Sequence, residues 1–476
     1  MYTTKITGML ALGGFVPTGK PGYTNRQQRN RSTRSLQRAG LIWFACAVSA
    51  VAISSAHAQA LLLSMSAEHT SPKLTTLYDF TGFSDGGNPS GLVIGDGGVL
   101  YGGTSSGGAF GLGTIFTLTP PPSPGGPWTE AVLYSFTGLS GANPSTPVFG
   151  SGGVLYGTTV AGGDSNLGTV FSLTPPATPG GNWTEVVVHS FSGGTNDGTY
   201  PTGIAIGGDG ALYGTTGSGG SGSCTLVGSG CGTVFSLRPP ASPGGKWKEK
   251  ILYNFMGDTD GSTPTVAVIG RSGVVYGTTV YGGGNACFNG CGTVFELTPP
   301  LEAGEAWTET LLYNFTGGTN DGFLPGGVVI GKGGVLFGTT YSGGSGPCAE
   351  TLPPSCGTVF SVTPPASPGG AWTEAVLYNF TGGSAAAYPM ASLAVGGVGV
   401  LYGTTLAGGT GHDGTVFSLS PPASPGGPWT ETVLHSFIGS TGSNASSVVI
   451  GSGGVLFGAT SFGGTSNAGT IYMLKP

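Results

Sequence analysis

The pentapeptide Leu155-Tyr156-Gly157-Thr158-Thr159 has a close copy in each of seven stretches of the chain. The aromatic residues that mark the copies are Tyr101, Tyr156, Tyr213, Tyr276, Phe337, Tyr402 and Phe457. A second pattern, Tyr or His two positions before Phe, begins at Tyr78 and recurs with spacings of 56, 55, 64, 60, 65 and 57 residues. A period of this length indicates tandem repeats that each form one supersecondary unit.

Each repeat contains four short apolar segments with turn sequences between them. In the repeat 201–255 these segments are 203–207, 211–216, 232–237 and 247–255. Gly, Pro and Asp separate the segments, which is typical of turns between antiparallel strands, and no window has apolar residues at helical spacing. The pattern predicts an all-β fold, a single seven-bladed β-propeller over residues 73–476. A β-solenoid is the alternative, but its rungs are usually shorter, at roughly 20–30 residues.

The two ends of the repeat region complement each other. The last repeat has strand-like segments at 448–450, 455–460 and 469–474 and then ends without a fourth. The isolated segment 73–80 is of the missing type. We therefore expect the N-terminal strand to complete the last blade and leave no open sheet edge.

The first 58 residues have the composition of an export signal. They carry seven Lys and Arg residues and no acid, then an apolar run at 41–53 and the sequence Ala56-His57-Ala58. These features predict a signal peptide over residues 1–58 that is removed, followed by a tether at 59–72. The apolar run is shorter than the roughly 20 residues that span a bilayer. We therefore predict a secreted, extracellular protein of bacterial origin without a membrane span.

Removal of this leader leaves eight of the 15 basic residues against all 21 acids, a formal charge of −13. An acidic surface argues against nucleic acid or an anionic membrane as a partner. We expect the exported chain to be a monomer.

Six cysteines follow the leader, in three close pairs: Cys224 and Cys231, Cys287 and Cys291, Cys348 and Cys356. Each pair lies in one loop between the second and third strands of blades three, four and five. Export favours disulfides, and of the fifteen pairings available the three local ones are expected. A thiolate metal cluster is the alternative, although the spacings match no zinc pattern.

The bridged loops share one face of the predicted propeller with the loops between consecutive blades. Acidic and aromatic residues gather there in blades three to five, and we predict that they bind a ligand: Asp197, Tyr200, Asp258, Asp260, Tyr281, Asp321, Phe323 and Tyr341, with Asn285 and Phe288 nearby. Acids, amides and exposed aromatics are typical of sugar or peptide sites. The alternative is structural, because Asn-Asp-Gly and Asp-x-Asp-Gly are strong turn formers. No cofactor is expected; calcium is a weak alternative because Asp258 and Asp260 match only part of a calcium loop.

No catalytic signature stands out. Gly103-Thr-Ser105-Ser-Gly107 matches the esterase motif, but no helix is expected after it, and no spaced His cluster indicates a metal site. His189 and His435 replace Tyr in the repeat and are interpreted as packing residues. One Glu recurs in six repeats and is interpreted as an edge charge: Glu130, Glu185, Glu249, Glu309, Glu374 and Glu431. Glutamates so far apart do not form a glycosidase pair, whose carboxylates lie roughly 5–10 Å apart.

The predicted function is therefore a non-enzymatic extracellular binding or adhesion module for a glycan or a protein. The alternatives are a secreted polysaccharide lyase or hydrolase built from the loop acids, and a structural spacer. The repeat, with Gly91-Leu-Val-Ile-Gly-Asp-Gly-Gly-Val-Leu-Tyr-Gly102 and Gly168-Thr-Val-Phe-Ser-Leu-Thr-Pro175 as examples, resembles the GloVer tandem repeat of the choice-of-anchor group of bacterial exported proteins. The resemblance extends from Lys73 to Pro476. It implies a surface or secreted propeller-like protein and no particular activity, and this chain shows no C-terminal anchor.

Overall fold

The computed structural model describes residues 72–476, except 179, 225–229, 243, 266, 285–286, 288, 303, 349–354, 368 and 425. The predicted signal peptide, nearly all of the tether, Asn285 and Phe288 lie outside the described residues. The described residues belong to one compact unit, Thr70–Pro476. No helix in this part of the chain is long and apolar enough to cross a membrane.

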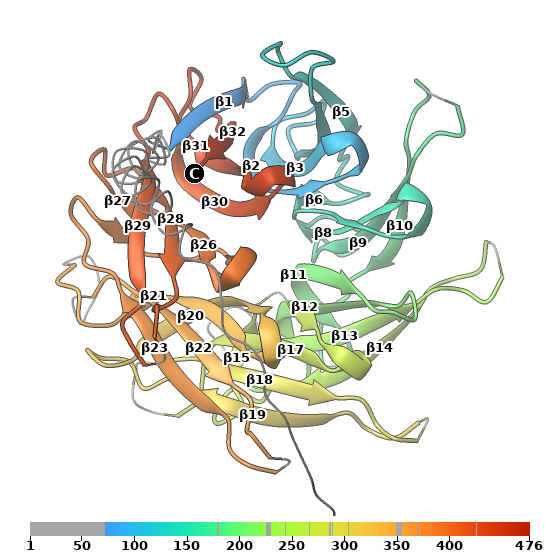
Figure 1. Ribbon diagram of the computed structural model, residues 1–476. Coiled ribbons are helices and arrows are strands. Elements are labelled where there is room, and N and C mark those ends of the chain that lie inside the picture. The colour runs from blue at the N-terminus through green and yellow to red at the C-terminus, as the bar shows by residue number, and fades with distance from the viewer. Residues whose placement is uncertain are drawn as a thin grey trace, which may run out of the picture. The chain divides into compact units, whose positions relative to one another are not determined.

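Seven antiparallel blades are arranged around an axis in chain order, as the colours in Figure 1 show. Blade one consists of β2 (Gly87–Ile94), β3 (Leu100–Ser106), β4 (Thr114–Thr119) and β5 (Thr129–Ser135). Blade two has a broken first strand, β6 (Ala142–Pro144) and β7 (Val148–Phe149), then β8 (Leu155–Ala161), β9 (Thr169–Thr174) and β10 (Thr184–Ser190). Blade three consists of β11 (Gly198–Ile206), β12 (Leu212–Gly219), β13 (Thr233–Arg238) and β14 (Lys248–Asn254).

The remaining blades repeat this plan. Blade four contains β15 (Ser262–Pro264), β16 (Val268–Ile269), β17 (Val275–Tyr281), β18 (Thr293–Thr298) and β19 (Thr308–Asn314). Blade five contains β20 (Gly322–Ile330), β21 (Leu336–Gly343), β22 (Thr358–Thr363) and β23 (Thr373–Asn379). Blade six contains β24 (Ala386–Ala387), β25 (Ala394–Val395), β26 (Leu401–Thr405), β27 (Ala407–Gly408), β28 (Thr415–Ser420) and β29 (Thr430–Ser436).

Blade seven combines both ends of the described chain, and its strand order is β1-β32-β31-β30. Its strands are β30 (Ser443–Ile450), β31 (Leu456–Phe462), β32 (Thr470–Lys475) and β1 (Lys73–Asp79). The predicted closure is confirmed, because β1 pairs with β32 in antiparallel register (Figure 1). Short 3-10 turns join the first two strands of six blades: η1 (Asp96–Gly98), η2 (Ser151–Gly153), η3 (Arg271–Gly273), η4 (Lys332–Gly334), η5 (Gly397–Gly399) and η6 (Ser452–Gly454).

The Gly and the two Thr residues of the repeated pentapeptide have separate packing roles, which blade four illustrates. A Cβ atom on Gly277 would lie only 2.6 Å from Cζ of Phe295 on β18, so only glycine admits that ring. The Thr278 hydroxyl donates to the carbonyl of Gly326 in the next blade, and Thr279 exchanges a buried 2.8 Å hydrogen bond with Thr293. The pentapeptide therefore fixes contacts both within its blade and with the next blade.

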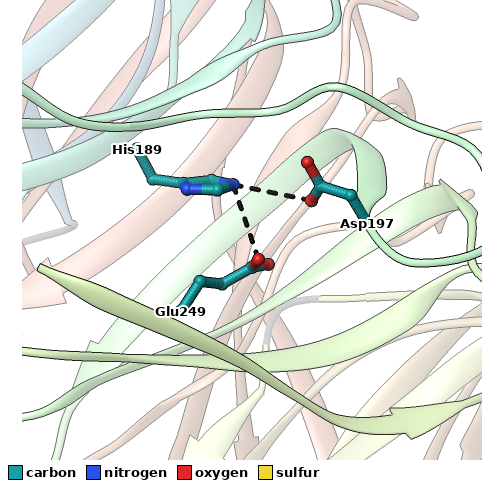
Figure 2. Close-up of side chains that lie close together, drawn as sticks. All are labelled: His189, Asp197 and Glu249. Carbon is teal, nitrogen blue, oxygen red and sulfur yellow. Dashed lines mark ion pairs between the residues drawn. The ribbon is translucent and has the colours of Figure 1, made fainter.

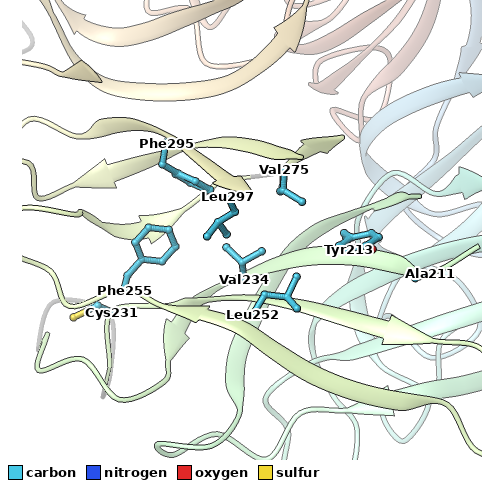
Figure 3. Packing of buried hydrophobic residues seen from close by; sticks show 10 residues of the cluster. Ala211, Tyr213, Cys231, Val234, Leu252, Phe255, Val275, Phe295 and Leu297 are labelled. Carbon is cyan, nitrogen blue, oxygen red and sulfur yellow. The ribbon is translucent and has the colours of Figure 1, made fainter. Parts of the chain in front are cut away.

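An aromatic ladder joins neighbouring blades. The Phe that follows the outer strand of one blade packs edge-on against the aromatic residue of the third strand of the next, with ring centroids 5.0–5.2 Å apart. Figure 3 shows this arrangement between blades three and four, where Phe255, Phe295, Val234 and Leu297 belong to one buried cluster. Blade interfaces are therefore the hydrophobic core of this fold, and burial of both faces of each sheet stabilises the array.

Candidate functional site

The predicted loop acids mostly serve the turns that contain them. Asp321 is 4% exposed and accepts hydrogen bonds from the Thr316 amide and hydroxyl and the Gly322 amide at 2.6–2.8 Å. Asp260 accepts from the Tyr253 hydroxyl and the amides of the two residues after Phe255 at 2.9–3.1 Å. Asp197 has the same role before β11. Only the Asp258 side chain is exposed.

The three local disulfides are confirmed: Cys224–Cys231, Cys287–Cys291 and Cys348–Cys356. Each bridge packs against a glycine in the turn that leads to the next blade. A Cβ on Gly257, for example, would lie 2.4 Å from Sγ of Cys224. The bridges therefore hold the loops between second and third strands against the neighbouring acidic turns.

Two predicted aromatic residues, Tyr281 and Tyr341, line a cavity of about 860 Å³ on the propeller axis. They come from the ends of β17 and β21, on the face that carries the disulfides. Every blade contributes to the lining, which includes Ser90, Thr146, Thr202, Thr263, Thr265, Val280, Leu324, Met390, Leu406, Asn444 and Ser446. This cavity, called the axial cavity below, opens at the axial mouth, the end of the propeller axis on the disulfide face. Six of the predicted binding residues do not line it: Asp197, Tyr200, Asp258, Asp260, Asp321 and Phe323.

The lining of this axial cavity is uncharged. Among the described residues it contains Ser and Thr hydroxyls, the two Tyr rings, one Asn amide and apolar side chains, with no Asp, Glu, Lys, Arg or His. Met390 is 57% exposed although it is large and apolar. Concave surfaces with exposed aromatic and apolar groups and a few hydrogen-bonding groups are typical of small-ligand sites.

Seven equivalent residues at the start of the innermost strands have left-handed backbone conformations, with φ between 52° and 59°: Asn88, Asn143, Tyr200, Thr263, Leu324, Tyr388 and Asn444. Asn adopts this conformation readily, whereas a β-branched or bulky residue is strained there by about 1–3 kcal/mol. Asn occupies it in blades one, two and seven. In blades three to six the chain instead carries Tyr200, Thr263, Leu324 and Tyr388, and two of these line the cavity.

Tyr388 is a site residue that the sequence analysis missed. Its ring stacks against that of Tyr341, with centroids 5.0 Å apart and planes at 24°. Tyr388 is buried, so it supports the Tyr341 ring beside the cavity. The available signal was the residue before Pro in six of the repeats, which is Asn in two of them and Tyr, Thr or Leu in the others.

The interpretation of the recurring glutamates as edge charges is wrong. Their side chains lie at blade interfaces; the Tyr134 hydroxyl, for example, donates to Glu185 Oε2 of the next blade at 3.3 Å. In all six, Oε1 is buried and has no hydrogen-bond partner among the described residues. Burial raises the pKa to about 7 in five of them, Glu130, Glu185, Glu249, Glu309 and Glu374. The outer strand of each blade lies against the next blade, so these glutamates, which were expected at the outer rim, are partly enclosed between blades.

A closed ring of seven sequence-related blades with a hollow axial mouth defines this molecule as a tandem-repeat β-propeller. The model of the Gloeobacter/Verrucomicrobia repeat family matches residues 62–227, 123–350 and 346–476, and the chain belongs to this family. The resemblance noted in the repeats is thereby confirmed. No curated protein sequence matches the chain.

Solved propellers resemble the structure at low identity. The extracellular domain of a one-component system from B. thetaiotaomicron is 11% identical, with 86% of this chain and 42% of that chain covered and a TM-score of 0.49. A polysaccharide lyase described as an ulvan lyase is 13% identical, with 83% and 95% covered and a TM-score of 0.48. The PQQ-bound aldose sugar dehydrogenase from Streptomyces coelicolor is 12% identical, with 85% and 98% covered and a TM-score of 0.41. Likenesses at this level carry no information about activity.

Proposed function

We propose that this protein is a non-enzymatic extracellular binding module that takes a short uncharged glycan at its axial cavity. The observation that carries the proposal is the cavity itself, which combines hydroxyl groups, two Tyr side chains and no charged side chain among the described residues. Its volume of about 860 Å³ lies within the range of roughly 300–1,000 Å³ that is usual for small-ligand pockets. Three disulfides support an oxidising, extracellular setting.

The lining chemistry favours a neutral sugar over a charged one. Ser and Thr hydroxyls both donate and accept, so they match the hydroxyl groups of a sugar. Tyr281 and Tyr341 offer aromatic surface with a polar tip, on which the apolar face of a sugar ring can pack. A charged ligand would enter this cavity without a counter-ion, which is unfavourable.

The same lining favours binding over turnover. Tyr281 and Tyr341 are its only ionisable side chains among the described residues, and no carboxylate or imidazole accompanies them. General acid–base catalysis of glycoside cleavage ordinarily needs a pair of such groups at the bond. The loop acids that the enzyme alternative required are held in turns away from the cavity.

We expect residues 59–476 to show saturable binding to one class of neutral oligosaccharide on a glycan array. Replacing Tyr281 with Ala should weaken binding to that sugar at least tenfold, because stacking surface is lost, while Tyr281→Phe should weaken it less. Isothermal titration calorimetry measures both. Cleavage of the bound sugar would contradict the non-enzymatic assignment, and equal affinity of the Tyr281→Ala variant would contradict the axial site.

The strained position Leu324 offers a paired test of stability and binding. Leu324→Asn introduces the residue that blades one, two and seven carry at the same φ, so it should stabilise the fold by about 1 kcal/mol. The same change removes an apolar side chain from the cavity and should weaken sugar binding. Urea denaturation and calorimetry measure the two effects.

The matched control for this variant is Tyr200→Asn, at the equivalent position of blade three and outside the cavity lining. It should raise stability to a similar extent and leave the affinity for the sugar unchanged. Equal loss of binding in both variants would show that relaxation of the backbone, and not contact with Leu324, controls the affinity.

A further inference from the structure

A second cluster of polar side chains lies between blades two and three, away from the axial cavity. His189 is on β10, Asp197 is in the turn before β11, and Glu249 is on β14 (Figure 2). His189 Nε2 is 3.5 Å from Asp197 Oδ1 and 3.8 Å from Glu249 Oε2. One ligand atom from each residue lies within 4.8 Å of the others. The side chains are 8–20% exposed.

The equivalent clusters at other interfaces are closed by a Tyr hydroxyl. Tyr253 donates to Asp260 at 2.9 Å, and Tyr313 donates to Asp321 at 3.0 Å. At the interface of blades two and three, the shorter His side chain instead makes longer ion-pair contacts with the two carboxylates. Among the described residues, neither His189 Nε2 nor Glu249 Oε1 has a hydrogen-bond partner, although both atoms are buried.

The spacing of these atoms fits a central metal ion. Zn²⁺ binds nitrogen and oxygen ligands at about 2.0–2.2 Å, so neighbouring ligands of a tetrahedral ion lie about 3.3–3.6 Å apart. The separations of His189 from Asp197 and Glu249, 3.5 and 3.8 Å, are close to that edge length, and the two carboxylates lie within 4.8 Å of each other. Two carboxylates and one neutral imidazole would also balance the charge of a divalent cation in a partly buried place.

The structure already orients one of these ligands. Asp197 Oδ2 accepts from the Ser192 amide at 2.7 Å and from its hydroxyl at 2.8 Å, and Oδ1 accepts from the Gly198 amide at 2.7 Å. Such supporting hydrogen bonds are characteristic of carboxylates that bind metals. They leave a lone pair of Oδ1 for an ion.

We propose that His189, Asp197 and Glu249 form a site for a divalent first-row transition metal, with Zn²⁺ as its probe. The ion links blades two and three through three protein ligands and leaves a fourth position to water. An imidazole ligand favours a transition metal over calcium or magnesium, which prefer all-oxygen sites.

The chain contains a matched control for this site. His435 on β29 occupies the same place in its repeat and packs against Phe437 as His189 packs against Phe191. In the neighbouring blade, Leu74 and Thr441 occupy the repeat positions of Glu249 and Asp197, so the two carboxylates of the His189 cluster have no counterpart at those positions. His189→Tyr recreates the arrangement found around Tyr253 and Tyr313 and is therefore expected to fold.

The test is a titration of residues 59–476, free of any affinity tag, with Zn²⁺ at neutral pH by calorimetry, followed by thermal melting. We expect one ion per chain and a rise of several degrees in Tm with excess Zn²⁺, since binding to the native state alone stabilises it. His189→Tyr should abolish both effects, Glu249→Gln should weaken binding at least about tenfold, and His435→Tyr should change neither.

Two results would overturn the proposal. One is the absence of saturable Zn²⁺ binding to the unmodified chain. The other is equal binding by the unmodified chain and the His189→Tyr variant when both fold, which would place any bound ion elsewhere.

Discussion

Deleting residues 72–80 should leave the chain unable to form a stable propeller. Without β1, blade seven loses its outer strand, and β32 becomes an exposed edge with unpaired backbone groups. The deletion also removes Phe80, which is fully buried and packs against Phe116 of blade one with ring centroids 5.1 Å apart. The ring of blades would therefore be open at the interface between blades seven and one.

The expected size of this effect is comparable with the whole stability of a typical domain. Loss of one buried Phe side chain costs about 3–5 kcal/mol, and total stabilities are usually about 5–15 kcal/mol. We expect residues 81–476 to aggregate or to melt well below residues 72–476 in circular dichroism and size-exclusion chromatography. Phe80→Ala should lose about 3–5 kcal/mol in urea. Thr76→Ala, at an exposed position of β1, is the control and should be nearly neutral. A deletion that melts like the intact chain would show that closure is dispensable.

Raising the pH from 5 to 8 should destabilise the protein. Five glutamates at blade interfaces have pKa values of about 7, and burial is the main cause. The pKa of Glu431 is also raised by burial. In an unfolded chain these groups ionise near pH 4.3. Between these values the folded state binds more protons than the unfolded state, so stability is fully present below about pH 4.3 and falls as the pH rises through 7.

Several neighbouring charges modify this trend. Asp85, Asp260 and Asp321 raise the pKa values of Glu130, Glu309 and Glu374. Near Glu249 the His189 side chain acts in the opposite direction and lowers its pKa. Because the glutamate pKa is raised at each of these interfaces, the contributions of the glutamates to the pH dependence of stability should add around the ring.

Urea denaturation at pH 5, 6, 7 and 8 and constant ionic strength measures the effect. We expect the free energy of unfolding to fall by an amount on the order of a few kcal/mol, because partial exposure screens each group. The double variant Glu309→Gln and Glu374→Gln keeps the shape without the charge, and it should reduce the pH dependence and gain stability at pH 8. Stability that is constant or that increases toward pH 8 would show that these carboxyl groups stay accessible to water when folded.

The fold was predictable from the sequence because each repeat carries its own packing instructions. The glycine of the pentapeptide, the Phe of the third strand and the Phe after the fourth strand recur in register, and they form the contacts within and between blades. The isolated segment 73–80, which has the sequence of the strand missing from the last repeat, likewise predicted that the ring of blades closes. The three disulfides followed from short loops and pairs of cysteines, because no other partner lay within the same loop.

The candidate sites were less predictable because they depend on how separate repeats meet. The axial cavity takes one or a few residues from each blade, and apart from Tyr281 and Tyr341 these are ordinary residues such as Thr202, Leu324 and Met390. The loop acids Asp260 and Asp321 accept hydrogen bonds within their own turns, which is the structural alternative that the sequence analysis named. The cluster around His189 joins residues from two blades and becomes visible only when the Tyr at equivalent interfaces is seen to contact an acid.

The central claim is that the axial mouth binds an uncharged glycan, and hydrogen–deuterium exchange with the best sugar from the array tests it most directly. Binding should slow amide exchange in the innermost segments that line the cavity, 263–265, 324–327, 390–392 and 444–447, and leave the outer strands β14 and β19 unchanged. Protection confined to the outer strands or to the acidic turns, or an array without any neutral sugar that binds, would contradict the account.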